Sequence, residues 1–152
     1  YLQTERCLMW QQNDGGREAA GYKGQAGDCV TRAIAIATGK PYQEVYDALN
    51  GLAVNERKGK RKRGKSSARN GVYRATFAKY LLSLGWQWHP TMAIGQGCKV
   101  HLRADELPQG NLIVSVSRHM VAVINGVIHD THDPSREGTR CVYGYWSVGD
   151  NA

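Results

Sequence analysis

The dipeptide Asn125-Gly126 constrains the fold more than any other feature of the 152-residue chain. It lies between the apolar run 119–124 (HMVAVI) and the shorter run 127–131 (VIHDT). Asn-Gly in such a setting is the strongest short-range signal for a two-residue β-hairpin turn, because both turn positions need a positive φ. The sequence therefore predicts two antiparallel strands joined at this turn.

The turn also fixes which residues of the two strands face each other. With a two-residue turn, Ile124 pairs with Val127, and counting outward places His119 opposite His132. Asp130 is then a diagonal neighbour of His119 on the same face of the hairpin, within reach of its side chain. A histidine and a carboxylate are thus expected side by side.

The residues before 86 predict helices. Residues 29–38 (CVTRAIAIAT) are strongly apolar and lie between Asp28, a favourable N-cap, and Gly39, a favourable residue after a helix. Proline suits the first turn of a helix, and aromatic and leucine side chains recur at spacings of three and four after residue 72. Two further helices are therefore predicted, one beginning at Pro41 and one from near Asn70 to Gly85.

The residues after 85 predict strands instead, because short β-branched or aromatic runs recur there. Helices followed by strands predict an α+β fold, in which the helices pack on an antiparallel β-sheet. The length fits a single domain over residues 1–152. The strands are expected at residues 86–89, 111–117, 119–124, 127–131 and 140–147, with a further short strand at 7–10.

Positive charge is concentrated in one segment. Residues 57–65 (RKGKRKRGK) contribute seven of the 20 basic residues, and the remaining 13 balance the 13 acidic ones. A run without apolar residues predicts an exposed loop, at about residues 55–69, that can bind nucleic acid or an acidic partner. The candidate polyanion-binding residues are Arg57, Lys58, Lys60, Arg61, Lys62, Arg63 and Lys65.

Cys29 is the candidate nucleophile. It follows Asp28 at the predicted start of a helix, where partial positive charge and free backbone N–H groups lower the pKa of a thiol. Its own N–H can hold a developing oxyanion. Gln25, in the glycine-rich segment KGQAGD, is the candidate side-chain donor to the same oxyanion.

His119 is the candidate general base for that thiol. A neighbouring carboxylate fixes the tautomer of such a histidine and stabilises its cation. The strand count favours Asp130 as this orienting residue. His132 and Asp133 are the alternatives, and Asp133 falls on the opposite face unless the strand bulges.

The order Gln25, Cys29, His119 and Asp130 resembles that of the papain-like cysteine peptidases. The segment GDCVTRAIAIATG is similar to the nucleophile helix of the C39-like bacteriocin-leader peptidases and, more loosely, of the ovarian-tumour deubiquitinases. The segment RHMVAVINGVIHDTHDPS resembles the C39-like pattern of His, strand, hairpin, strand and Asp-Pro, which matches Asp133 to the acid of that family. Residues 51–70 match nothing in it.

The resemblance implies a nucleophile helix packed on an antiparallel sheet that bears the histidine and its orienting residue. It implies a cysteine-dependent hydrolase, without a cofactor, that cleaves an amide or isopeptide bond of a peptide, protein or small amide through a thioester. The alternative is a catalytically silent papain-like binding module that docks on nucleic acid or an acidic partner through its basic loop.

The cysteines are Cys7, Cys29, Cys98 and Cys141, without a CxxC pair. They are too few for a disulfide scaffold, no signal peptide is visible, and no apolar run is long enough to span a membrane. We therefore expect reduced thiols in a cytoplasmic protein of a bacterium or a phage-infected cell.

Zinc is the metal that the sequence suggests as a candidate. Cys98 with His101, and His129 with His132, have nearly the spacing of zinc ligands. Residues three apart on a strand point to opposite faces, however, and neither pair lies in a short metal-binding knuckle. No metal site is expected.

Overall fold

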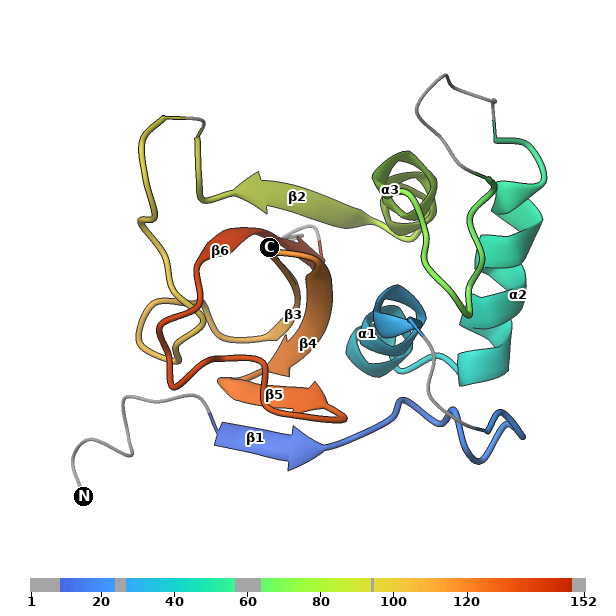
Figure 1. The fold of residues 1–152 in the computed structure, drawn as a ribbon, viewed down its shortest axis with the longest axis horizontal. Helices are drawn as coiled ribbons and strands as arrows, with labels where there is room; N and C mark the ends of the chain where they lie inside the picture. Colours follow the sequence, from blue (N-terminus) through green and yellow to red (C-terminus); the bar gives the residue numbers. More distant parts are fainter. Residues whose placement is uncertain (1–8, 24–26, 57–63, 94, 149–152) are drawn as a thin grey trace.

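The computed structural model describes residues 9–23, 27–56, 64–93 and 95–148. Its helices are α1 (Cys29–Thr38), α2 (Tyr42–Ala53) and α3 (Arg74–Ser83), and its strands are β1 (Met9–Gln12), β2 (Trp86–Pro90), β3 (Asn111–Val116), β4 (His119–Ile124), β5 (Val127–Asp130) and β6 (Val142–Val148). The helices pack on one side of a six-stranded sheet, which confirms the α+β class (Figure 1). α1 lies between the sheet and α2.

The sheet is mixed, so the expected antiparallel sheet is wrong at one edge. The strand order is β1-β5-β4-β3-β6-β2, and each neighbouring pair is antiparallel except β1 with β5, which run parallel. The four residues of β1 carry no signal for a partner at the other end of the chain. Trp10 Nε1 nevertheless helps to fasten β1, because it donates to the backbone carbonyl of Asp130 at 3.1 Å.

The predicted hairpin is confirmed. Ile124 pairs with Val127, and the turn residues Asn125 and Gly126 have φ values of 47° and 82°. β4 also pairs with β3 along its whole length, so its register is fixed on both sides. The beginning of β4 and the end of β5 therefore lie together.

α1 has the boundaries that the sequence predicts. Gly39 ends it in the left-handed conformation, and its N–H donates to the carbonyl of Ala35 at 3.0 Å. The prediction of Asp28 as a side-chain N-cap is wrong, because its carboxylate makes no capping hydrogen bond. The carboxylate is buried and accepts from Arg32 Nη1 at 2.6 Å, since a buried charge needs a counter-charge.

α3 begins later than predicted. Ser67 and Gly71 exchange two backbone hydrogen bonds of 2.8 Å, so Asn70 belongs to a turn. Gly71 has φ 142°, which is incompatible with a helix, and the helix begins at Arg74. α2 begins directly after Pro41, within one residue of the prediction.

The loop expected to be exposed at 55–69 is packed against the protein at its C-terminal end. Residues 57–63 lie outside the described residues, and Lys65 is exposed. Ser66 and Ala68 are buried. The carboxylate of Glu56 holds this end, because it accepts from the backbone N–H of Ser66 at 2.6 Å and from its hydroxyl.

Both faces of the sheet are buried. One core lies between the sheet and the helices and contains Ile113, Ala122 and Trp146. The second lies on the opposite face and contains Val114 together with Leu102 from the segment before β3. Burial on both faces explains why β3 and β4 read as continuous apolar runs.

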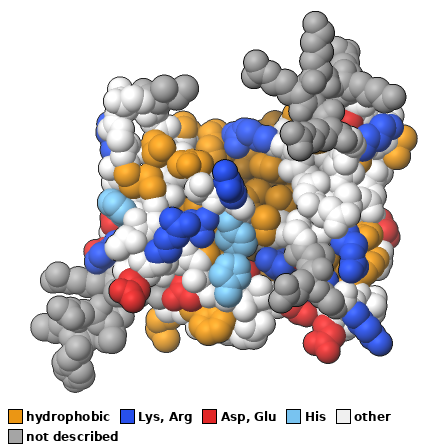
Figure 2. Space-filling view, viewed as in Figure 1, with side chains coloured by type: hydrophobic (Ala, Val, Ile, Leu, Met, Phe, Trp, Pro, Cys, Tyr) orange, Lys and Arg blue, Asp and Glu red, His pale blue; other side chains and the backbone are white. Residues whose placement is uncertain are grey.

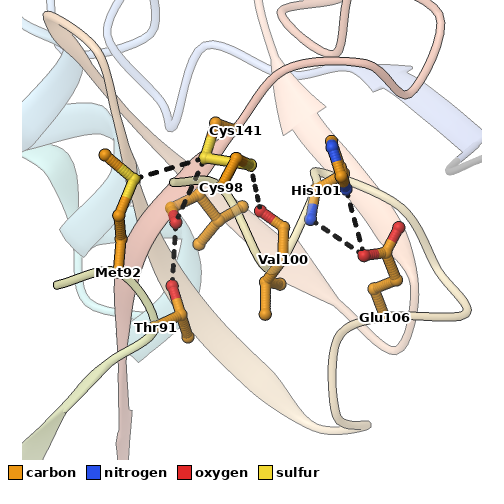
Figure 3. Close-up of a disulfide and its surroundings, with 8 residues drawn as sticks. Thr91, Met92, Cys98, Val100, His101, Glu106 and Cys141 are labelled. Atoms are coloured by element: carbon orange, nitrogen blue, oxygen red, sulfur yellow. Dashed lines mark hydrogen bonds and ion pairs between the residues drawn. A yellow bond between two sulfur atoms is a disulfide. The ribbon is translucent and has the colours of Figure 1, made fainter. Parts of the chain in front are cut away.

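Cys98 and Cys141 form a disulfide, so the prediction that they are reduced thiols is wrong (Figure 3). The bridge joins the segment before β3 to the residue before β6, across 43 positions of sequence. The sequence gives no local signal for this pairing, because it depends on which distant segments meet. Cys29 is the free cysteine among the described residues, and Cys7 lies outside them.

No helix in the described ranges is long and apolar enough to cross a membrane. The cytoplasmic location stays a prediction.

Candidate active site

Cys29 is the first residue of α1 and lines a cleft. The first backbone N–H groups of a helix have no acceptor inside it, so they and the helix dipole place partial positive charge at the thiol. Ala33 and Ile34 are almost completely buried, and α1 packs on β4. The packing of this apolar helix therefore fixes the thiol relative to the sheet.

His119 begins β4 and Asp130 ends β5, so the hairpin brings the two side chains together. His119 Nε2 lies 2.6 Å from Asp130 Oδ2. Because Nε2 faces the carboxylate, Nδ1 is the ring nitrogen left for Cys29, which is hydrogen-bonded to the same imidazole. The three side chains form a continuous series of thiol, imidazole and carboxylate.

Of the three candidate orienting residues, Asp130 makes the direct contact with His119. His132 is exposed, and its ring centroid lies 5.2 Å from that of His119. Asp133 accepts from the backbone N–H of Ser135 at 3.0 Å, in the turn that follows β5. The strand count thus predicts the contact better than the Asp-Pro match does.

The three groups shift one another's pKa. Burial by itself would raise the pKa of the Cys29 thiol, but the hydrogen bond and charge of His119, with the N–H of Met120, outweigh it and lower that pKa. Burial would lower the pKa of His119, but Asp130 and Cys29 raise it to about 9. The pKa of Asp130 is lowered, against burial, mainly by His119. At neutral pH these directions favour a thiolate beside an imidazolium.

A buried charge network lies behind the site, and sequence reasoning missed it. Asp28 accepts from Arg32 Nη1 and from the Tyr42 hydroxyl, each at 2.6 Å, and Arg17 Nε lies 3.3 Å from it. Arg32 Nη2 also lies 3.3 Å from Asp130 Oδ1. The available signal is an arginine inside an otherwise apolar helix, four residues after an aspartate.

This network raises the pKa of one neighbouring group and lowers the pKa of others. Burial, and then the carboxylate of Asp28, raise the pKa of Tyr42. The charge of Arg32 lowers the pKa of both Cys29 and Asp130. One guanidinium therefore links the two buried carboxylates and favours the ionised form of the thiol.

A cleft of about 920 Å³ opens beside Cys29. One wall is the start of α1 with residues 70–72, and the other is the tip of the β3–β4 hairpin with residues 131–132. Phe77 adds apolar surface. Figure 2 shows histidine side chains near the middle of the face in view, among Lys and Arg side chains and beside a hydrophobic strip.

Gln25, the candidate oxyanion donor, and the basic residues between 57 and 63 lie outside the described residues. Lys65 is the one candidate polyanion-binding residue that is described, and its ammonium donates to the carbonyl of Val54 at 3.0 Å.

Of the near-ligand pairs, Cys98 is in the disulfide, and His129 Nδ1 lies 3.2 Å from Asn13 Nδ2. Within the described ranges, the residues that can hold a metal are His119, Asp130 and His132, whose ligand atoms lie within 4.8 Å of one another. The 2.6 Å contact between His119 and Asp130 already joins two of these ligands.

A thiol with a lowered pKa, an oriented imidazole and free N–H groups beside a cleft are the parts that nucleophilic attack on a carbonyl requires. No protein-family model matches the chain, and neither does a curated protein or a solved structure. A functional proposal therefore rests on the chemistry of the site.

Proposed function

We propose that the protein is a papain-like cysteine hydrolase, a peptidase or amidase, that cleaves an amide or isopeptide bond through a thioester. The observation that carries the proposal is the series Cys29, His119 and Asp130 at the cleft, with the thiol at a helix start and the His119–Asp130 contact of 2.6 Å. The pKa directions support it, because the thiol is favoured as thiolate and the imidazole as imidazolium.

In the first step, the Cys29 thiolate attacks the carbonyl carbon and forms a C–S bond, and the carbonyl oxygen takes the negative charge. The N–H groups at the start of α1 stabilise that oxyanion in this proposal, because they have no acceptor inside the helix. The intermediate collapses as the C–N bond breaks, and the His119 imidazolium gives its proton to the leaving amine. The products are a thioester on Cys29 and a free amine.

In the second step, neutral His119 takes a proton from water as the water oxygen attacks the thioester carbon. The C–S bond breaks, the carboxylic acid leaves, and the thiolate–imidazolium pair is restored. Asp130 keeps the imidazole oriented and stabilises its cation in both steps. Gln25 remains a predicted second oxyanion donor.

The test is alkylation by iodoacetamide between pH 4 and 9, with the modified residue located by mass spectrometry. We expect Cys29 to react with an apparent pKa well below the free-thiol value of about 8.5. His119→Ala should raise that pKa, whereas a Cys7→Ser control should leave it unchanged. A Cys29 that reacts no faster than a free thiol would contradict the proposal and favour the silent binding module.

A further inference from the structure

The described lining of the cleft is positively charged. It contains Arg17, Arg32 and Arg118 together with His119, whose pKa is raised to about 9. No Asp or Glu lines the cleft among the residues that the structure describes. A ligand that reaches the thiol therefore meets cationic groups on the walls.

The three arginines are not equivalent. Arg17 pairs with Asp28, and Arg32 pairs with both Asp28 and Asp130. Arg118 is exposed, and it makes no hydrogen bond or ion pair with another residue of the described chain. Its guanidinium is thus available to a ligand, whereas the other two are held by buried carboxylates.

The hairpin that carries His119 also positions Arg118. Ser117 and Arg118 form the turn between β3 and β4, and Arg118 has φ 57°. Glycine or asparagine is usual at such an angle, so the turn holds the arginine in a conformation that its residue type rarely adopts. Arg140 braces the turn, because its guanidinium donates to the carbonyl of Ser117.

We infer that the substrate of the proposed hydrolase carries a carboxylate beside the bond that is cleaved, and that Arg118 binds this carboxylate. The inference rests on the proposed function. A guanidinium holds a carboxylate through two parallel hydrogen bonds, and Arg118 is adjacent in sequence to His119. Val30, Val72 and Phe77 line the same cleft, so the substrate class is an acidic peptide with an apolar residue near the scissile bond.

The test compares iodoacetate with iodoacetamide at Cys29, because iodoacetate places a carboxylate beside the reacting carbon. Both alkylation rates are divided by the rates with glutathione, which removes the intrinsic difference between the reagents. His119 also attracts the anion, so the variant Arg118→Gln is used to isolate the contribution of Arg118. We expect this variant to lower the preference for iodoacetate over iodoacetamide about fivefold, which corresponds to ~1 kcal/mol.

Arg136→Gln is the matched control. Arg136 is exposed and has φ 52°, but it does not line the cleft. Arg136→Gln removes an equal charge from a residue with a similar backbone conformation, and this variant should keep the native preference for iodoacetate. The inference would be overturned if both variants lost the preference for iodoacetate equally, or if Arg118→Gln did not lose it. Fast alkylation by iodoacetamide would still support a thiol hydrolase in either case. Slow reaction of Cys29 with both reagents would overturn the proposed function itself.

Peptides extend the test to the substrate class. N-acetyl-Phe-Glu amide should slow the alkylation of Cys29 by iodoacetamide more than N-acetyl-Phe-Gln amide does. The difference should disappear in Arg118→Gln and persist in Arg136→Gln. Equal protection of the native protein by the two peptides would count against carboxylate recognition.

Discussion

Arg32 Nη2 lies 3.3 Å from one oxygen of Asp130, and the other oxygen of that carboxylate lies 2.6 Å from His119 Nε2. Arg32 stands on α1, three residues after Cys29. The same helix therefore carries the candidate nucleophile and the cation that holds the orienting carboxylate. A displacement of this helix would move both ends of the series at once.

Arg32→Met should weaken the fold and the site together. Removing one partner of a buried ion pair costs about 3 to 5 kcal/mol, because it leaves a buried charge uncompensated. We expect a loss of ~3 kcal/mol in the free energy of unfolding, measured in urea, since Asp28 keeps Arg17 and Tyr42. The pKa of Cys29 should rise, because the charge of Arg32 lowers it, and iodoacetamide alkylation then shifts to higher pH.

Arg17→Met is the control for this effect. Arg17 pairs with Asp28 at 3.3 Å but not with Asp130. We expect it to lower stability while the pH profile of Cys29 alkylation stays native. Equal shifts of the profile in both variants would show that Arg32 has no specific relation to the site.

Asp130→Asn should lower the pKa of His119 from about 9 toward its ordinary value of 6.5, because the variant removes a hydrogen-bonded negative charge. His119 in the native protein keeps its proton up to a pH of about 9 and loses it above. In the variant the loss moves to lower pH. NMR titration of the imidazole carbon resonances measures both values.

Asp133→Asn tests the competing assignment that the Asp-Pro pattern suggests. The carboxylate of Asp133 accepts from Ser135, so this variant should leave the His119 titration near 9. A fall of the His119 pKa in Asp133→Asn, with none in Asp130→Asn, would reverse the assignment of the orienting residue.

The Cys98–Cys141 bridge predicts a labelling pattern and a stability difference. In protein purified without a reductant, Cys29 should react with iodoacetamide, and Cys98 and Cys141 should react only after reduction and unfolding. Closing a loop across 43 positions is worth roughly 2 to 4 kcal/mol, so the double serine variant should lose about that much in urea unfolding. Labelling of Cys98 in the native, unreduced protein would contradict the bridge.

Replacing two of the glycines by alanine should change the free energy of unfolding in opposite directions. A methyl group at Gly144 would overlap with the ring of Trp88 and lie 2.8 Å from the carbonyl oxygen of His89. Gly144→Ala should therefore cost about 1 to 3 kcal/mol. Gly51 lies on α2 with nothing within 4 Å of an added methyl group, so Gly51→Ala should gain up to ~1 kcal/mol from helix propensity. Urea unfolding of both variants compares the signs, and a neutral Gly144→Ala would contradict the packing.

The features that could be predicted from the sequence are those with local causes. The turn at Asn125-Gly126 sets its own register, and that register alone places Asp130 beside His119. The boundaries of α1 follow from an apolar run that ends at Gly39. Each of these signals lies within a dozen residues.

The features that were missed depend on which distant segments meet. β1 pairs with β5, and Cys98 bonds to Cys141, but no local sequence pattern predicts either contact. Asp28 looked like a helix cap because a cap is the local use of an aspartate there. Its actual role is to accept from and pair with side chains such as Tyr42 and Arg17, which only the folded chain brings to it.

The parallel pairing of β1 with β5 has a consequence for the order of folding. Trp10 Nε1 and the N–H of Asn13 both donate to the carbonyl of Asp130, across a sequence separation of about 120 residues. Closing so long a loop is among the slowest events in a chain of this size. During synthesis Cys29 precedes β4 and β5, the strands that carry its base and its carboxylate. We therefore expect Cys29 to remain an ordinary thiol until β4 and β5 have been synthesised and have packed against α1.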